Sequence, residues 1–241
     1  MTPFEPIPLY RDRRGQPLRS PALYHRIKAE ADVLRLWRGE RQTPPLMTRP
    51  PWVVCRAGGD DENRGLRAAF RRWTPSGGPP TPEMEEAVHD HIPQDAPFRE
   101  LPSEDQNAGV ARLAVVLHLV ALGWADNQAR TVGSVGKACA GSDPSAVLIS
   151  NTRFARLLTA PPEPVRRVEA LGRAFRQFKR ARLHVAPSDA PNLLRWLFSA
   201  EPEAAARIWA GDYFRITRPG EPAAADDPEG DGAPDSSSID A

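Results

Sequence analysis

Cysteines and long apolar runs are both scarce in this sequence. Only two of its 241 residues are cysteines, Cys55 and Cys139, and neither belongs to a Cys-x-x-Cys pair. A disulfide framework or a zinc ribbon is therefore not expected, and we predict two reduced thiols. No run of about 18 apolar residues is present, and the first twenty residues lack the charged-then-apolar order of a secretion signal. These absences predict a cytoplasmic protein without a membrane-spanning helix.

Alternating runs of β-branched residues are nearly absent as well. Only Trp52–Arg56 is compatible with a strand, and one short strand has no evident partner. Apolar residues recur instead at spacings of three and four, which predicts helices. The predicted helical segments are 20–41, 60–73, 103–124, 134–141, 149–160, 166–184, 188–200 and 202–214. We therefore expect an all-α fold with two helical bundles joined by proline-rich connections.

Composition divides the chain into four predicted regions. These are an N-terminal extension (1–20), an N-terminal helical domain with proline-rich insertions (21–130), a C-terminal helical bundle (131–216) and a disordered acidic tail (217–241). The tail carries seven acidic residues and one base, a net charge of −6 within a chain of net charge +1. The remaining residues are therefore basic, and we expect the tail to shield a basic groove before a polyanion arrives.

The sequence also lacks the motifs of common catalytic sites. The stretch GSVGKAC fails as a phosphate loop, because Thr131 stands where the first glycine is required and Ala138 follows the lysine. No Gly-x-Ser-x-Gly motif occurs, so we predict a non-enzymatic protein without a cofactor or a metal. One alternative stays open, a helical metal-dependent nuclease or phosphohydrolase. It would use His89, Asp90, His91 and His118, although a surface pair on a loop explains His89 and His91 better.

Positive charge gathers in the segment RRVEALGRAFRQFKRARLH (166–184). It contains seven lysines and arginines and one acid, Glu169. As a helix it would have one apolar stripe and one basic band. A solvated polar face usually mixes signs, so this band favours contact with nucleic-acid phosphates. A protein-only adaptor that meets an acidic partner remains an alternative. The predicted nucleic-acid-binding residues are Arg67, Arg71, Arg72, Arg153, Arg166, Arg173, Arg176, Lys179 and Arg180.

The order of motifs from Ala111 to Phe214 resembles a known family. SVGKACAG and ISNTRFARLLTA are followed by the basic helix, then by NLLRWLF and WAGDYF. This order is similar to that of the CasB small subunit of the type I-E CRISPR surveillance complex, Cascade. The turn HVAPSDAPN departs from the pattern, because the family often has an Asp-Trp pair there.

The resemblance implies an all-helical, non-catalytic subunit of that complex. Its partners would be the repeated backbone subunit, the large subunit and a second copy of itself. Its basic face would hold the guide RNA–target DNA heteroduplex and the displaced single strand, through sequence-independent contacts that stabilise the R-loop. The resemblance assigns such contacts to Arg153, Arg173 and Arg176, to the pair Arg71 and Arg72, and to Lys137.

Overall fold

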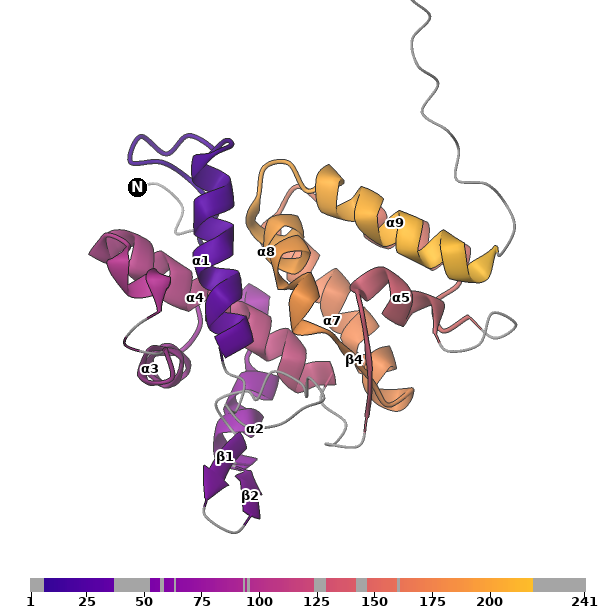
Figure 1. The fold of residues 1–241 in the computed structure, drawn as a ribbon, viewed down its shortest axis with the longest axis horizontal. Helices are drawn as coiled ribbons and strands as arrows, with labels where there is room; N and C mark the ends of the chain where they lie inside the picture. The colour runs from indigo at the N-terminus through magenta and orange to yellow at the C-terminus, as the bar shows by residue number, and fades with distance from the viewer. Residues whose placement is uncertain are drawn as a thin grey trace, which may run out of the picture.

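The computed structural model describes residues 7–36, 53–56, 59–62, 64–92, 94, 96–123, 129–141, 147–159 and 161–218. Most of the described chain is helical, which confirms the all-α prediction (Figure 1). The helices are α1 (Ala22–Leu36), α2 (Arg64–Arg72), α3 (Pro82–Asp90), α4 (Ser103–Gly123), α5 (Val135–Ala140), α6 (Asn151–Leu158), α7 (Pro164–Arg180), α8 (Ala190–Phe198) and α9 (Glu203–Thr217). The acidic tail from residue 219 onward lies outside the described residues.

Helix α4 forms the centre of the fold. It is apolar on all sides and nearly every residue from Gly109 to Gly123 is buried. By length and composition alone α4 could cross a membrane, but most of it is buried inside the protein. Helices α2, α3 and α7 pack directly against it, and α8 also contacts it. This arrangement brings α2 and α7, which are far apart in the sequence, onto the same central helix.

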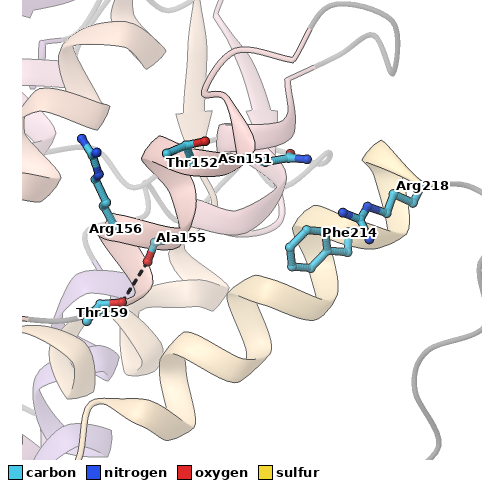
Figure 2. Close-up of a pocket in the computed structure, with 7 residues that line it drawn as sticks. All are labelled: Asn151, Thr152, Ala155, Arg156, Thr159, Phe214 and Arg218. Carbon is cyan, nitrogen blue, oxygen red and sulfur yellow. Dashed lines mark hydrogen bonds between the residues drawn. The ribbon is translucent and has the colours of Figure 1, made fainter.

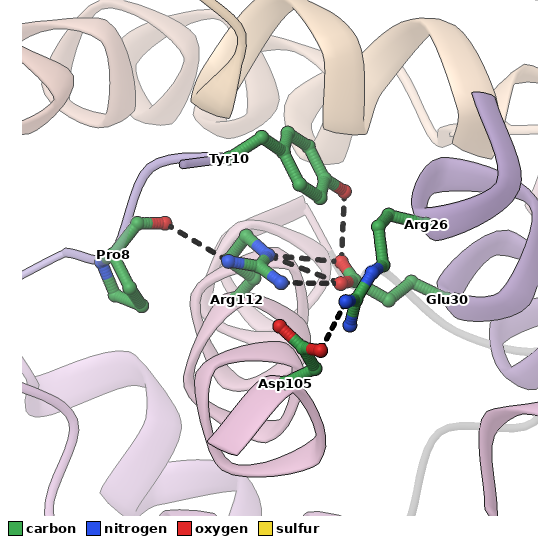
Figure 3. A network of polar contacts seen from close by, with 6 residues as sticks. All are labelled: Pro8, Tyr10, Arg26, Glu30, Asp105 and Arg112. Atoms are coloured by element: carbon green, nitrogen blue, oxygen red, sulfur yellow. Dashed lines mark hydrogen bonds and ion pairs between the residues drawn. The ribbon is translucent and has the colours of Figure 1, made fainter. Parts of the chain in front are cut away.

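The N-terminal segment is part of the hydrophobic core. Ile7 and Tyr10 are almost fully buried, and the Tyr10 amide donates to the Phe198 carbonyl of α8 (3.1 Å). The Tyr10 hydroxyl donates to Glu30 Oε2 (2.8 Å), and Glu30 in turn accepts from Arg112 (2.6 Å) (Figure 3). This network fastens residues 7–10 to α1, α4 and α8.

Two small sheets were missed by the sequence prediction. Strand β1 (Val53–Arg56) pairs antiparallel with β2 (Gly59–Glu62), so the strand predicted at 52–56 does have a partner. That partner is rich in Gly and Asp, which have low β propensity, and for this reason it could not be recognised. Strand β3 (Arg130–Val132) pairs in parallel with β4 (Leu183–Val185).

Two predicted helix boundaries are wrong. Helix α2 begins at Arg64, because residues 60–62 lie in β2. Helix α7 ends at Arg180 and not at His184, because Arg182 adopts a positive φ of 53° and its carbonyl accepts the Arg130 amide (2.9 Å). Pairing with β3 thus replaces the last predicted turn.

Residues 74–102, where the sequence predicts no helix, contain regular structure. Besides α3 they include the short 3₁₀ helices at Pro75–Gly77 and Pro97–Glu100. Met84, Val88 and Phe98 are fully buried there. His89 and Asp90 end α3 and His91 is its C-cap, so the predicted loop position of these residues is wrong.

Candidate nucleic-acid interface

The basic residues of α2 and α7 meet on one side of the molecule. Burial lowers the pKa of Lys179, and repulsion from Arg71 and Arg67 lowers it further. Since repulsion of this kind requires proximity, cations separated by more than a hundred residues converge here. We call Arg67, Arg71, Arg176 and Lys179 the α2–α7 cluster.

Helix α7 has the two faces that its sequence predicts. Val168, Leu171, Phe175 and Phe178 are buried and pack into the core. Arg173, Arg176 and Arg180 are exposed on the other side. Because a helix rises about 1.5 Å per residue, the band from Arg166 to Arg180 is about 21 Å long. It is therefore long enough to follow several nucleotides of a strand.

Three cations of this surface lack an acidic partner among the described residues. Within the described part of the chain, Arg71, Arg176 and Lys179 form no ion pair with a carboxylate. Arg72 is also exposed, next to Arg71 at the end of α2. A surface with several unneutralised cations attracts a polyanion over a distance set by the ionic strength.

His118 lies beneath this surface, where it supports the contact between α4 and α2. Its Nδ1 donates to the Phe70 carbonyl (2.6 Å), and its ring meets the edge of Trp73 at a centroid distance of 5.0 Å. Burial lowers the pKa of His118, Arg176 lowers it further, and the Phe70 bond opposes the change. His118 is therefore a packed histidine whose position favours the neutral ring.

The other candidate metal ligands are engaged separately. His89 Nε2 accepts from Arg99 (3.0 Å), and His91 Nδ1 donates to the Ala87 carbonyl (2.8 Å). Among the described residues no group of three His, Cys, Asp or Glu side chains could hold a metal ion. His89, His91 and His118 thus have separate partners, and the described residues do not bring them together as the ligands of a metal-dependent nuclease.

Three predicted residues lie away from the α2–α7 cluster. Arg166 is exposed at the start of α7 and faces Glu163 at 3.6 Å. Arg153 is exposed on α6, which packs against α9. Lys137 is half-buried on α5, with its side chain close to Gly133.

One arginine of the basic segment has a purely structural position. Arg167 is 5% exposed and donates to the carbonyls of Pro161 (2.6 Å), Trp196 (3.1 Å) and Ser199 (2.7 Å). It thereby satisfies carbonyl groups at the C-terminal end of α8, which have no partner within the helix. Its charge does not reach the exposed band.

A shallow groove between α6 and α9 contains residues that the sequence did not single out. It has a volume of about 720 Å³ and is lined by Asn151, Thr152, Ala155, Arg156, Thr159, Phe214 and Arg218. The Arg218 guanidinium lies 5.1 Å from the Phe214 ring centroid, and Phe214 is 37% exposed. Figure 2 shows the Arg156 side chain pointing away from α9, so its guanidinium does not join this pair.

The motifs that carried the resemblance contact one another. Ser134 caps α5 and donates to Asp212 on α9 (2.6 Å), while Gly136 lies directly against the Trp209 backbone. The Tyr213 hydroxyl bonds to Asn151 and to the Ile149 carbonyl (2.7 Å each). These motifs therefore build the contacts among α5, α6 and α9.

A family model described as CRISPR-associated protein Cse2 matches residues 66–214, which is more than half of the chain. The chain belongs to this family. No curated protein and no solved structure matches it. The Cse2 family is the small subunit of the type I-E Cascade complex, so this chain is a Cascade small subunit. The Cse2 match contains the whole α2–α7 cluster and leaves out α1 and the N-terminal segment.

Proposed function

We propose that this Cse2 protein stabilises the R-loop of a type I-E Cascade complex by holding nucleic-acid backbone on its α2–α7 cluster. The observation that carries the proposal is that α2 and α7 both pack on α4 and bring Arg67 and Arg71 close enough to Lys179 to lower its pKa beyond the effect of burial. Bound phosphates would remove the repulsion that this convergence creates. The four clustered cations should therefore bind a polyanion more tightly than the same cations would if they were far apart.

The contact would be independent of sequence and non-catalytic. No recognition helix in a helix-turn-helix arrangement is seen in the described residues, so we expect contacts to phosphates and not to base edges. Because exchange between the DNA duplex and the RNA–DNA heteroduplex is nearly balanced, a modest attraction to the backbone can shift it toward the R-loop. Both the heteroduplex and the displaced strand are proposed ligands.

The other predicted nucleic-acid-binding residues have secondary roles in this proposal. Arg72, Arg173 and Arg180 extend the α2–α7 cluster along the same helices, and Arg166 extends the α7 band toward its first turn. Arg153 and Lys137 would contact other parts of the nucleic acid or a neighbouring subunit. The proposed protein partners are the backbone subunit, the large subunit and a second copy of this chain. The complex would act in the cytoplasm.

The test uses the assembled complex with Arg71→Gln and Arg176→Gln combined, one exposed cation from each helix. We expect the lifetime of the R-loop on a labelled target DNA to fall about tenfold at low salt, because two phosphate contacts are lost. A shallower dependence of the lifetime on salt should accompany this loss. Arg207→Gln with Arg215→Gln, two exposed arginines of α9, is the matched control.

Two outcomes would contradict the proposal. If the variant complex assembles and its R-loop lasts as long as that of the wild type, the cluster does not hold nucleic acid. If instead the variant subunit fails to join the complex while its fold is intact, the cluster is a protein contact, as the adaptor alternative requires.

A further inference from the structure

A second basic surface lies in the N-terminal segment, outside the residues matched by the family model. Residues 11–19 contain four arginines, Arg11, Arg13, Arg14 and Arg19, and one acid, Asp12. All four arginines are exposed. We call residues 11–19 the arginine turn.

The backbone of the arginine turn is well ordered by its own hydrogen bonds. Asp12 Oδ1 accepts the amides of Arg14 and Gln16 (2.8 Å each), and the Gly15 amide donates to the Asp12 carbonyl (2.9 Å). Gly15 has a φ of 74°, which favours glycine at this position. The Asp12 carboxylate and the Arg11 guanidinium, which donates to the Gly15 carbonyl (3.0 Å), therefore stabilise the turn itself, while Arg13, Arg14 and Arg19 are exposed around it.

The turn is also anchored firmly to the core. Tyr10, which precedes it, is 2% exposed, and the Leu18 amide donates back to the Tyr10 carbonyl (2.9 Å). Arg112 lies over the Tyr10 ring at 4.3 Å (Figure 3). From this anchor the turn projects beyond the start of α1 (Figure 1). Side chains on an anchored turn lose less conformational entropy on binding than those on a loose segment.

An exposed aromatic ring follows the arginine turn, in the first turn of α1. The Arg19 carbonyl accepts the Leu23 amide, so Arg19 belongs to the first turn leading into α1. Tyr24 follows five residues later, is 55% exposed and meets His25 edge to face. Lys28 is exposed one turn further along, and the first turn of α1 has no acid. Cations beside an exposed aromatic ring are the combination that binds single strands.

We propose that the arginine turn and Tyr24 form a second binding site, for single-stranded nucleic acid. The arginines hold phosphates, and the Tyr24 ring stacks on an unpaired base. The choice of nucleic acid over an acidic protein rests on the proposed function, since it assumes that nucleic acid passes close to this subunit. The site itself shares no residue with the α2–α7 cluster.

The experiment measures binding of the purified full-length chain to a fluorescent 30-nucleotide single-stranded DNA over a range of NaCl concentrations. For Arg13→Gln with Arg14→Gln we expect about tenfold weaker binding at low salt. The slope of log affinity against log salt should become less steep by about 1.4, the value for two lost contacts to a single strand. Arg13→Lys with Arg14→Lys should keep most of this slope.

Tyr24 is tested separately. Tyr24→Leu should weaken binding about fivefold or more with an unchanged salt slope, while Tyr24→Phe should bind as the wild type does, because only the ring is needed for stacking. Since all these side chains are exposed, thermal unfolding of every variant should match the wild type.

The outcomes separate this inference from the proposed function. If Arg13→Gln with Arg14→Gln binds as tightly as the wild type while Arg71→Gln with Arg176→Gln binds weakly, the arginine turn is not a site and the α2–α7 cluster stands. If only the arginine-turn variant loses binding, the arginine turn is a site and the α2–α7 cluster does not bind single-stranded DNA. If the arginine-turn variant keeps DNA binding but no longer assembles with the other Cascade subunits, the turn binds protein and the inference is wrong.

Discussion

At the scale of single residues, Asp189 is the most informative acid in the protein. Its carboxylate accepts the Val135 amide (2.9 Å), the Asn192 amide group (2.7 Å) and the Trp209 indole N–H (3.0 Å). Burial raises its pKa to about 6, helped by the nearby Asp212, although the three donors oppose the increase. Asp189 thus joins α5, α8 and α9. The free-energy cost of keeping its buried carboxylate ionised depends on pH.

The pH dependence of this cost can be measured. Because the pKa is raised in the folded state, protonation favours folding. The stability that this provides is fully present below about pH 4 and is lost as the pH rises through about 6, a difference of about 3 kcal/mol. We expect Asp189→Asn to remove this part of the pH dependence of the free energy of unfolding, measured in urea between pH 4 and 7. Glu86→Gln, at an exposed carboxyl, should keep the wild-type profile. An unchanged profile in Asp189→Asn would show that Asp189 is ionised without cost.

The role of Arg167 shows what the sequence does not predict about a single residue. Arg167 has the same charge as Arg166 and Arg173, but its spacing of four and seven residues from Leu171 and Ala174 places it on the apolar stripe of α7. The periodicity does not say which groups its guanidinium would meet there. Its partners are carbonyls at residues 196–199, and only the packing of α8 against α7 brings them near. The apolar stripe of α7 could be predicted because it depends on periodicity alone. The convergence of Arg71 with Lys179 and the exposure of Phe214 depend on tertiary packing and could not be.

At the scale of elements, the contact between α5 and α9 depends on a glycine. A Cβ added at Gly136 would lie 2.2 Å from the Trp209 carbonyl oxygen, so the two helices would have to separate. We expect Gly136→Ala to destabilise the protein by about 1–3 kcal/mol, as overpacking does, measured by urea unfolding. Gly211→Ala on the exposed side of α9 is the matched control, because its Cβ would meet nothing within 4 Å. The control should be stabilised by about 0.5–1 kcal/mol. Equal stability of the two variants would mean that α5 can shift freely on α9.

Elements were predictable where one local signal dominated. The long, almost entirely apolar stretch of α4 gave its bounds to within one residue, and Ser134 marks the start of α5 as an N-cap. Helix α3, the hairpin of β1 and β2 and the end of α7 were not predicted. In each case the local sequence is ambiguous, and pairing or packing with distant residues decides the structure. The division into an N-terminal helical domain and a C-terminal bundle remains a prediction.

At the scale of the whole molecule, one hydrophobic core extends from the N-terminal segment to α9. A buried ion pair lies at the junction of its parts. Arg112 on α4 and Glu30 on α1 are 3% and 0% exposed, and Glu30 also accepts from Tyr10. The Glu30 charge raises the pKa of Tyr10, as does burial, which has the larger effect. Beside this pair, Arg26 and Asp105 form a second bridge between α1 and α4 (Figure 3).

Removing one partner of the buried pair should therefore destabilise the packing of the N-terminal segment and α1 on α4. We expect Arg112→Met to lower the free energy of unfolding by about 3–5 kcal/mol, because Glu30 would remain buried without its cation. Glu30→Leu with Arg112→Met should recover most of this loss, because no unpaired charge is left, although the Tyr10 hydroxyl loses its acceptor. Urea unfolding of both variants measures the two values. Comparable losses in the single and double variants would show that packing of the long side chains, and not the buried charge, holds α1 on α4.

DNA binding by the arginine turn provides a second measurement, because the Tyr10 anchor of the turn depends on the same buried pair. Single-stranded DNA binding through the turn should weaken in Arg112→Met, while binding through the α2–α7 cluster should persist.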